Sequence, residues 1–466
     1  MRTGRGVSMA KRMNRREFVG MCATIVAGAI AAACKPSESP GASRPASETV
    51  AAAPTTTQPT AAPQQEKVTL LYWDGFGEEA AAVDDMVAAF NEAHPTIQVK
   101  RESQPNMREI LKTALSAGTG PDIMYYDTGP GFAGVLAYAG LLLPLDEAYA
   151  QYGWNERIFH WAKERTVFGG KTYGIGHELE FIGVFYNKRI YSELGLAEPK
   201  THDEYLAQCE KLKGAGYIPI AFSDQDKWPA GHMFSVFAGN IAGKDKLAKA
   251  ISGEAPWNDP DFVQAIQTFF VDMNKAGYFI PDVNAVTYDD ANSLFYSGKA
   301  ATTITGSWMV EAYTDPETMS DPVGFFFYPS IGGKPIAPPA GLGSGYFVSK
   351  ATKSPEGSFQ FLDYLMSEEA AKIWLEELAK IPPLHIDLSK YNLSDLFRFC
   401  VEALQQHADE MGYNIDVLTP DNFNTMMFDG FQEVLNGTKT AQQQADDLEK
   451  AMQEAKAAGK VMDITP

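Results

Sequence analysis

After the first 66 residues, the apolar positions alternate between short continuous runs, typical of buried strands, and the three- and four-residue spacing that is typical of helices. A short apolar run over residues 68–73 predicts a buried strand, and residues 97–99 and 121–126 predict two more. Between these runs, residues 83–90 and 107–117 place apolar side chains at helical spacing. Strand, helix, strand, helix, strand predicts a doubly wound, mainly parallel α/β sheet, in which ligands bind at the loops after the strand ends.

The same alternation returns further along the chain. Residues 201–204 form a Thr-x-x-Glu capping box that predicts the start of a helix, and a second helical pattern covers 258–273. Strands are predicted over 217–222 and 302–304, and a terminal helix over 442–458 is expected to be exposed. With 466 residues, the chain is long enough for two or three domains that each have a core.

The N-terminal residues predict an export signal rather than part of the fold. Within residues 1–33, basic side chains around the Arg15-Arg16 pair precede an apolar run over 19–33 that is too short for a membrane span. The arginine pair is typical of twin-arginine export. The final alanines favour lipoprotein cleavage with Cys34 as the acylated first residue, and ordinary cleavage after an Ala-x-Ala site is the alternative. We expect an exported protein, lipid-anchored at the outer face of the cell membrane or in the periplasm.

Composition and residue spacing narrow the functional classes. Residues 34–66 are rich in Pro, Ser, Thr, Ala and Gln, which predicts a disordered tether. The net charge of −20 disfavours nucleic acid as a partner, and membrane contact is expected through the lipid anchor only.

No zinc spacing, phosphate-binding loop or nucleophile motif occurs, so we expect no metal and no cofactor. Cys209 and Cys400 favour two isolated buried thiols, with a disulfide as the alternative.

Four segments carry a resemblance to a known family. Residues 90–95 (FNEAHP) close the first predicted helix, and residues 120–123 (GPDI) open the third strand. Residues 183–188 (GVFYNK) and 295–308 (from FYSGKAA to TGSW) follow in the family's order. Together they resemble the extracellular solute-binding proteins of ABC importers, in the sugar-binding group that includes maltose-binding protein. The resemblance covers almost all of residues 67–450.

The resemblance implies an α/β fold of two doubly wound lobes joined by hinge segments, as in periplasmic binding proteins of type II. Lobe one would comprise residues 67–178 plus 328–368, and lobe two residues 181–325 plus 369–466. The lobes would close on a ligand by a hinge motion. The implied partners are a small carbohydrate and the membrane subunits of an ABC permease, and the implied state is a monomer.

The resemblance also implies ligand-binding residues. A sugar site needs carboxylates for hydroxyl groups and aromatic rings for the C–H faces. Trp308 and Glu180 match a tryptophan and a glutamate that contact sugar in the maltose-binding relative, and Asp127 lies where that relative has an acidic contact. The alternatives are a core tryptophan, a hinge ion pair for Glu180 and a turn-capping role for Asp127.

Further candidates come from the predicted loops. Trp228 lies in a loop after a strand, where a tryptophan without a partner is unusual. Gly345 and Tyr346 lie near the expected crossing, where the backbone approaches ligand, although Tyr346 also suits a core. Glu178 shares a strand face with Glu180. The first strand-to-helix loop adds Trp73, Asp74, Glu78 and Glu79, of which the last two also suit a helix N-terminus.

These residues leave other functions open. Glu178 and Glu180, about 7 Å apart on one strand face, also suit a glycosidase, but nothing else in the sequence builds an active site. We therefore predict a binding protein without catalytic residues. The alternatives are the same fold binding a cationic solute such as a polyamine, a secreted carbohydrate-active enzyme, and a solute-sensing partner of a membrane kinase.

Overall fold

The computed structural model describes residues 67–77, 80–462 and 464, which belong to one compact unit. The predicted export signal, the Cys34 anchor and the tether lie outside the described residues. Within the described part of the chain, no helix combines the length and the apolar character needed to cross a membrane.

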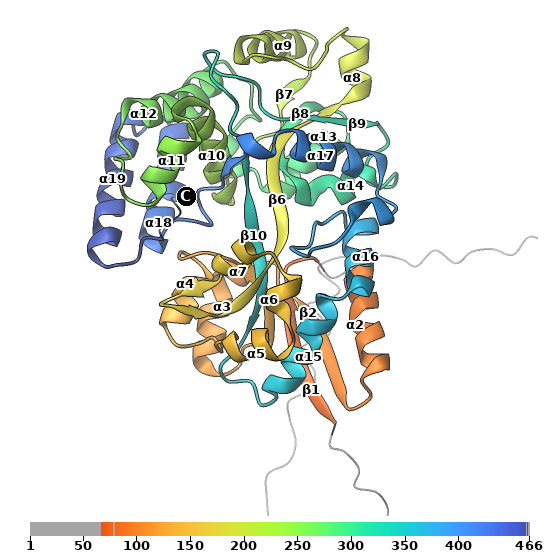
Figure 1. Cartoon of the computed structure of the whole chain (residues 1–466). Helices are drawn as coiled ribbons and strands as arrows, with labels where there is room; N and C mark the ends of the chain where they lie inside the picture. Colours follow the sequence, from red (N-terminus) through yellow and green to blue (C-terminus); the bar gives the residue numbers. More distant parts are fainter. Residues whose placement is uncertain (1–66, 78–79, 463, 465–466) are drawn as a thin grey trace, which may run out of the picture. The chain divides into compact units, whose positions relative to one another are not determined.

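The first half of the sheet is built as the apolar pattern predicts (Figure 1). β1 (Val68–Asp74) pairs in parallel with β2 (Ile97–Ser103) and with β3 (Ile123–Asp127). The connections are α2 (Ala81–Ala93) and α3 (Met107–Ala117). The apolar face of α2 is buried through Val83, Met86, Val87 and Phe90. The predicted strand-helix alternation is confirmed, and it brings the carboxyl ends of β1 and β3 to one edge of the sheet.

Two long strands connect this half of the sheet to a second half. β10 (Pro339–Val348) pairs antiparallel with β3 and with residues 174–181 of β6 (Gly174–Asn187). Residues 182–187 of β6 pair antiparallel with the strands of the second half. The order β2-β1-β3-β10-β6-β8-β7 therefore passes through both halves, and β6 and β10 lie side by side where they meet (Figure 1).

We call the elements packed with β1, β2 and β3 the first lobe. Its further elements are α4 (Ala133–Tyr138), α5 (Asp146–Gln151), α6 (Trp154–Arg157), α7 (His160–Glu164), β4 (Val167–Phe168), β5 (Lys171–Thr172), α15 (Pro355–Leu365) and α16 (Glu368–Glu376). The core of this lobe packs β1 against α2, α15 and α16.

The second lobe packs around the other half of the sheet. Its strands are β7 (Ile218–Ile220), β8 (Ala300–Gly306) and β9 (Val323–Phe326), and β11 (Gly412–Tyr413) pairs with the first residues of β10. Its helices are α8 (Lys188–Glu193), α9 (His202–Gly214), α10 (Trp228–Ala242), α11 (Lys244–Ile251), α12 (Pro260–Ile266), α13 (Tyr288–Tyr296), α14 (Val310–Thr314), α17 (Asp395–Gln406), α18 (Asp421–Leu435) and α19 (Ala441–Ala457). The helix predicted over 258–273 is α12, which continues as a π-helical stretch, η1 (Gln267–Met273).

The packing of three elements bears on where the second junction between the lobes lies. Tyr328, at the predicted boundary of 325–328, packs in the core of the second lobe. The return to the first lobe is made by β10, whose end at Val348 pairs with β3. α16 lies beyond the predicted boundary at residue 368, yet its Trp374 packs in the core of the first lobe. We therefore propose that lobe one begins its second segment within β10 and extends through α16.

The C-terminal helix is buried along one face, so the expectation that it is exposed is wrong. α19 packs against α18 and α12. Its buried residues are Ala441, Gln444, Ala445, Leu448, Ala451, Met452 and Ala455. Alanine carries little apolar signal, and for that reason the hydrophobic pattern understates the burial of this helix.

The two cysteines of the folded region do not pair. Cys209 and Cys400 are both free and buried, and they lie in separate apolar clusters. The favoured interpretation of two isolated buried thiols is confirmed.

Candidate functional site

A pocket lies where β6 and β10 pass between the lobes. This inner pocket has a volume of about 200 Å³. It is lined by Arg108, Asp127, Glu180, Trp228, His232, Trp308, Gly343, Ser344, Asn414, Asp416 and Val417. A wider cleft of about 920 Å³ is lined by some of the same residues, which come from both lobes. The inner pocket and this cleft therefore form one continuous recess. The recess is thus placed at the strand ends of an α/β sheet, where such folds bind ligands.

One wall of the inner pocket is aromatic. Trp308 follows β8 on a short 3-10 turn, and its indole Nε1 donates a hydrogen bond to the hydroxyl of Tyr288 at 3.0 Å. Trp228 opens α10, with its ring centroid 4.5 Å from Tyr288 and 6.1 Å from Trp308. We call Trp228, Tyr288 and Trp308 the aromatic wall. Both indoles are only partly buried, so the wall offers ring surface to a ligand.

Two carboxylates of the recess already hold basic partners. Arg108 on α3 binds Asp127 in a bidentate way, with Nε–Oδ2 at 2.8 Å and Nη2–Oδ1 at 2.7 Å. Glu178 on β6 is buried and accepts a hydrogen bond from Lys380 Nζ at 2.8 Å and one from the Tyr125 hydroxyl at 2.9 Å. The hinge ion pair considered for Glu180 is therefore made by its neighbour Glu178.

Glu180 has no such partner. Among the described residues, none donates a hydrogen bond to its carboxylate, which lines both the inner pocket and the cleft. The carboxylate lies over the backbone of Gly343 on β10, where a Cβ would come within 1.9 Å of Oε2. Burial, together with repulsion from Glu178, raises the pKa of Glu180 well above its usual value, although Lys380 partly offsets this.

Asp416 forms the floor of the inner pocket together with His232. It lies between β11 and α18, is fully buried, and neither carboxylate oxygen accepts a hydrogen bond from a described residue. His232 Nε2 is 3.5 Å from Asp416 Oδ2, which is too long for a well-formed hydrogen bond. Burial acts to raise the pKa of Asp416, but attraction to His232 and Arg108 outweighs it and lowers that pKa.

The loop after β1 does not contribute the side chains that the sequence suggests. Trp73 is buried in the first lobe, and its indole Nε1 donates to Glu102 at 3.2 Å. Asp74 is fully buried and binds Arg101 at 2.7 and 2.9 Å, so it joins β1 to β2. Neither side chain lines the inner pocket or the cleft, so we propose a structural role for both in place of the expected ligand role. Glu78 and Glu79 lie outside the described residues.

On β10, the candidates Gly345 and Tyr346 do not line the inner pocket. Tyr346 is fully buried in the core of the first lobe. A Cβ at Gly345 would lie 2.6 Å from the carbonyl oxygen of Ile175, so this glycine serves strand packing. The residues of β10 that line the inner pocket are Gly343 and Ser344.

Several lining residues were missed by the sequence analysis. His232 follows Trp228 by four positions, so both lie on one face of α10, and this spacing could have been used. Arg108 is the second residue of a helix that the pattern did predict. Asn414 and Asp416 lie in an irregular segment, and no periodic signal marks them.

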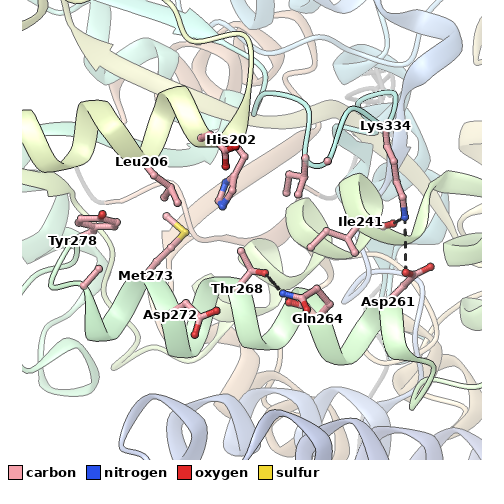
Figure 2. Close-up of a pocket in the computed structure, with 14 residues that line it drawn as sticks. His202, Leu206, Ile241, Asp261, Gln264, Thr268, Asp272, Met273, Tyr278 and Lys334 are labelled. Atoms are coloured by element: carbon pink, nitrogen blue, oxygen red, sulfur yellow. Dashed lines mark hydrogen bonds and ion pairs between the residues drawn. The ribbon is translucent and has the colours of Figure 1, made fainter.

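A second pocket of about 520 Å³ lies within the second lobe, away from β6 and β10 (Figure 2). It opens between α9 and the helix formed by α12 and η1, with Leu206 and Met273 facing each other across it. Several of its polar side chains are already paired, as Gln264 is with Thr268 at 3.0 Å and Asp261 with Lys246 at 2.8 Å. No buried polar atom without a partner is found among the described residues that line it. The recess between the lobes is therefore the stronger candidate.

Comparison with known proteins agrees with this geometry. Residues 85–385 match the family model described as bacterial extracellular solute-binding protein. The match covers more than half of the chain, and the chain therefore belongs to this family. The family is defined by solute binding outside the cytoplasm rather than by a reaction.

Relatives and solved structures extend this result. An uncharacterised ABC transporter extracellular-binding protein of Pyrococcus horikoshii is 29% identical over 261 residues, which is 54% of this chain. The match spans 58% of that relative, so this chain covers less than two thirds of the relative's length. A galactooligosaccharide-binding protein of Bacillus subtilis is 29% identical over 322 residues, covering 67% of this chain and 72% of that protein. The structure of a chitin oligosaccharide binding protein aligns with a TM-score of 0.76 and 24% identity, covering 84% of this chain and 99% of the other. This last similarity establishes the two-lobed fold.

Proposed function

We propose that the protein is an exported receptor that binds a carbohydrate between its lobes and delivers it to an ABC permease, without chemistry of its own. The observation that carries the proposal is the inner pocket, where an aromatic wall faces carboxylates at the crossing strands. Rings suit the C–H faces of a sugar and carboxylates accept its hydroxyl hydrogen bonds. Relatives named for sugar binding, such as the galactooligosaccharide-binding protein, support the same ligand class.

Within the pocket, each group has a separate role in this proposal. Trp308 and Trp228 stack on sugar rings, because both are partly exposed and line the recess. Glu180 accepts hydroxyl hydrogen bonds, because it has no described protein donor. Asp127 is held rigid by Arg108, and its remaining lone pairs serve as a fixed acceptor.

The proposed mechanism is a shift between open and closed forms. β6 and β10 are the strands that pass between the lobes, so they are the natural hinge. A ligand that touches residues of both lobes binds the closed form more tightly and increases its population. The permease then recognises the closed form. Export through residues 1–33, acylation of Cys34, a tether over 34–66 and a monomeric state complete the proposal.

A thermal-shift screen tests the proposal. Purified protein is heated with neutral mono- and oligosaccharides, polyols, polyamines and amino acids. A ligand at 100 times its Kd should add about 2.7 kcal/mol to the free energy of unfolding, which corresponds to a shift of a few degrees. Stabilisation by a saccharide is the expected result. Stabilisation by polyamines or amino acids, with none by any saccharide, contradicts the carbohydrate assignment.

A further inference from the structure

Three carboxylates line the inner pocket, and two of them lie near a basic side chain. Asp127 is paired with Arg108 at 2.7 Å, and Asp416 lies 3.5 Å from His232, which makes an ion pair only when this histidine is protonated. Glu180 is the remaining carboxylate of the inner pocket, and no basic side chain of the described residues lies within ion-pair distance of it. The pocket therefore has one more acidic group than basic groups.

The geometry around Glu180 holds its carboxyl group in place, and a cation bound beside it would lower the pKa that burial and Glu178 raise. Gly343 leaves room for the carboxylate against β10, because any larger residue would occupy its position. The same pocket contains Asp416, which is fully buried and has two oxygens without a described hydrogen-bond donor. Two acceptor groups thus face the same small volume, next to the exposed surface of Trp308. An occupant that only donates hydrogen bonds satisfies both.

We propose that the inner pocket receives an ammonium group carried by the sugar, so that the preferred ligand is an amino sugar with a free amine. This inference rests on the proposed carbohydrate function and specifies its ligand class. The ammonium forms an ion pair with Glu180, and its three N–H groups act only as donors. The indole faces of Trp308 and Trp228 add cation–π attraction.

The same charges define what the pocket rejects. A ligand carboxylate or phosphate placed beside Glu180 meets the acidic groups Glu180, Asp416 and Asp127 that line this pocket. A neutral N-acetyl group at this point leaves Glu180 without an opposite charge. Because the inner pocket is small, it holds only the charged end of the ligand, and the wider cleft accommodates the rest.

Titration calorimetry with matched saccharides tests the inference. The probes are short β-linked oligomers of glucosamine, N-acetylglucosamine and glucose, together with glucuronic acid. The amine form should bind about tenfold or more tightly than its N-acetyl and hydroxyl counterparts, and this preference should shrink as salt is raised. The glucuronate should show no binding.

The Glu180→Gln variant separates the charge from the shape of the pocket. It should bring the amine and neutral forms to about equal affinity, whereas Glu92→Gln, on the exposed face of α2, should keep the wild-type preference. Thermal unfolding confirms that both variants fold. Neutral sugars that bind as tightly as the amine form, or a preference that survives in Glu180→Gln, overturn the inference but leave the carbohydrate function standing. No binding of any saccharide overturns the proposed function itself.

Discussion

The carboxylate of Glu180 lies directly over Gly343 on the neighbouring strand, at a position where a Cβ would come within 1.9 Å of its Oε2. Gly343→Ala should therefore displace Glu180 from the inner pocket. We expect ligand affinity to fall by about tenfold, because a small misplacement of a binding group weakens its contacts. Gly341→Ala is the matched control on the same strand, since nothing lies within 4 Å of its added Cβ. Equal affinities for the two variants, measured by calorimetry, would show that Glu180 does not contact the ligand.

Trp308 should carry a large share of the binding free energy. Trp308→Ala is expected to weaken ligand binding by about 1.5–3 kcal/mol, because it removes a stacking ring from the aromatic wall. The protein should stay folded, since this side chain is only partly buried. Trp308→Phe keeps a ring and should lose less. Calorimetry on the ligand from the thermal-shift screen measures both variants, and unchanged affinity in Trp308→Ala removes this residue from the site.

The ion pair between Glu178 and Lys380 should be essential to stability rather than to binding alone. Only 4% and 6% of these side chains are exposed, so removal of Lys380 leaves a buried charge without a partner. Lys380→Met should lower the free energy of unfolding by about 3–5 kcal/mol. The double variant with Glu178→Gln should lose clearly less than the sum of the two single variants, because it removes both charges. Denaturant unfolding of all three variants measures the coupling, and strict additivity is the opposing result.

His177 predicts a specific dependence of stability on pH. It is fully buried among Tyr125, Tyr346 and Trp374, and neither ring nitrogen has a hydrogen-bond partner. Burial, aided by the charge of Lys380, lowers the pKa of His177 to about 3.

An unfolded histidine titrates near pH 6.5, so below that pH the unfolded chain takes up a proton that the folded one does not. This residue's contribution to stability is full above about pH 6.5 and falls by about 1.4 kcal/mol per pH unit down to about pH 3. His177→Phe should flatten the slope over this range and keep the stability at neutral pH. A slope identical to that of the wild type, in thermal unfolding at stepped pH, would exclude this role.

The sequence predicted most of the fold because its early elements have clear periodic patterns. β1, α2, β2, α3 and β3 appear where the apolar spacing placed them, since each buries one face or both. The second junction, which we propose to lie within β10, is hard to place from sequence, because β10 pairs with strands on both sides and its glycines carry no periodic signal. α19 was taken as exposed because its contact face is made largely of alanine.

The candidate site was predictable only where single residues stand out. Trp308 and Glu180 were found through the resemblance, and Trp228 through an unusual loop tryptophan, and all three line the inner pocket. Asp416 and His232 become neighbours only when α10 packs beside the segment after β11, which no local pattern encodes. Asp74 carries a carboxylate of the kind that binds sugar hydroxyl groups, but it forms an ion pair with Arg101 on the adjacent strand.

The most direct test of the central claim is a calorimetric titration with the saccharide that most stabilises the protein, carried out on the wild type and on the Trp308→Ala/Glu180→Gln double variant. The account predicts a single site per wild-type chain and a loss of detectable binding in a double variant that remains folded. Binding of undiminished affinity in that variant would place the sugar elsewhere and contradict the assignment of the inner pocket.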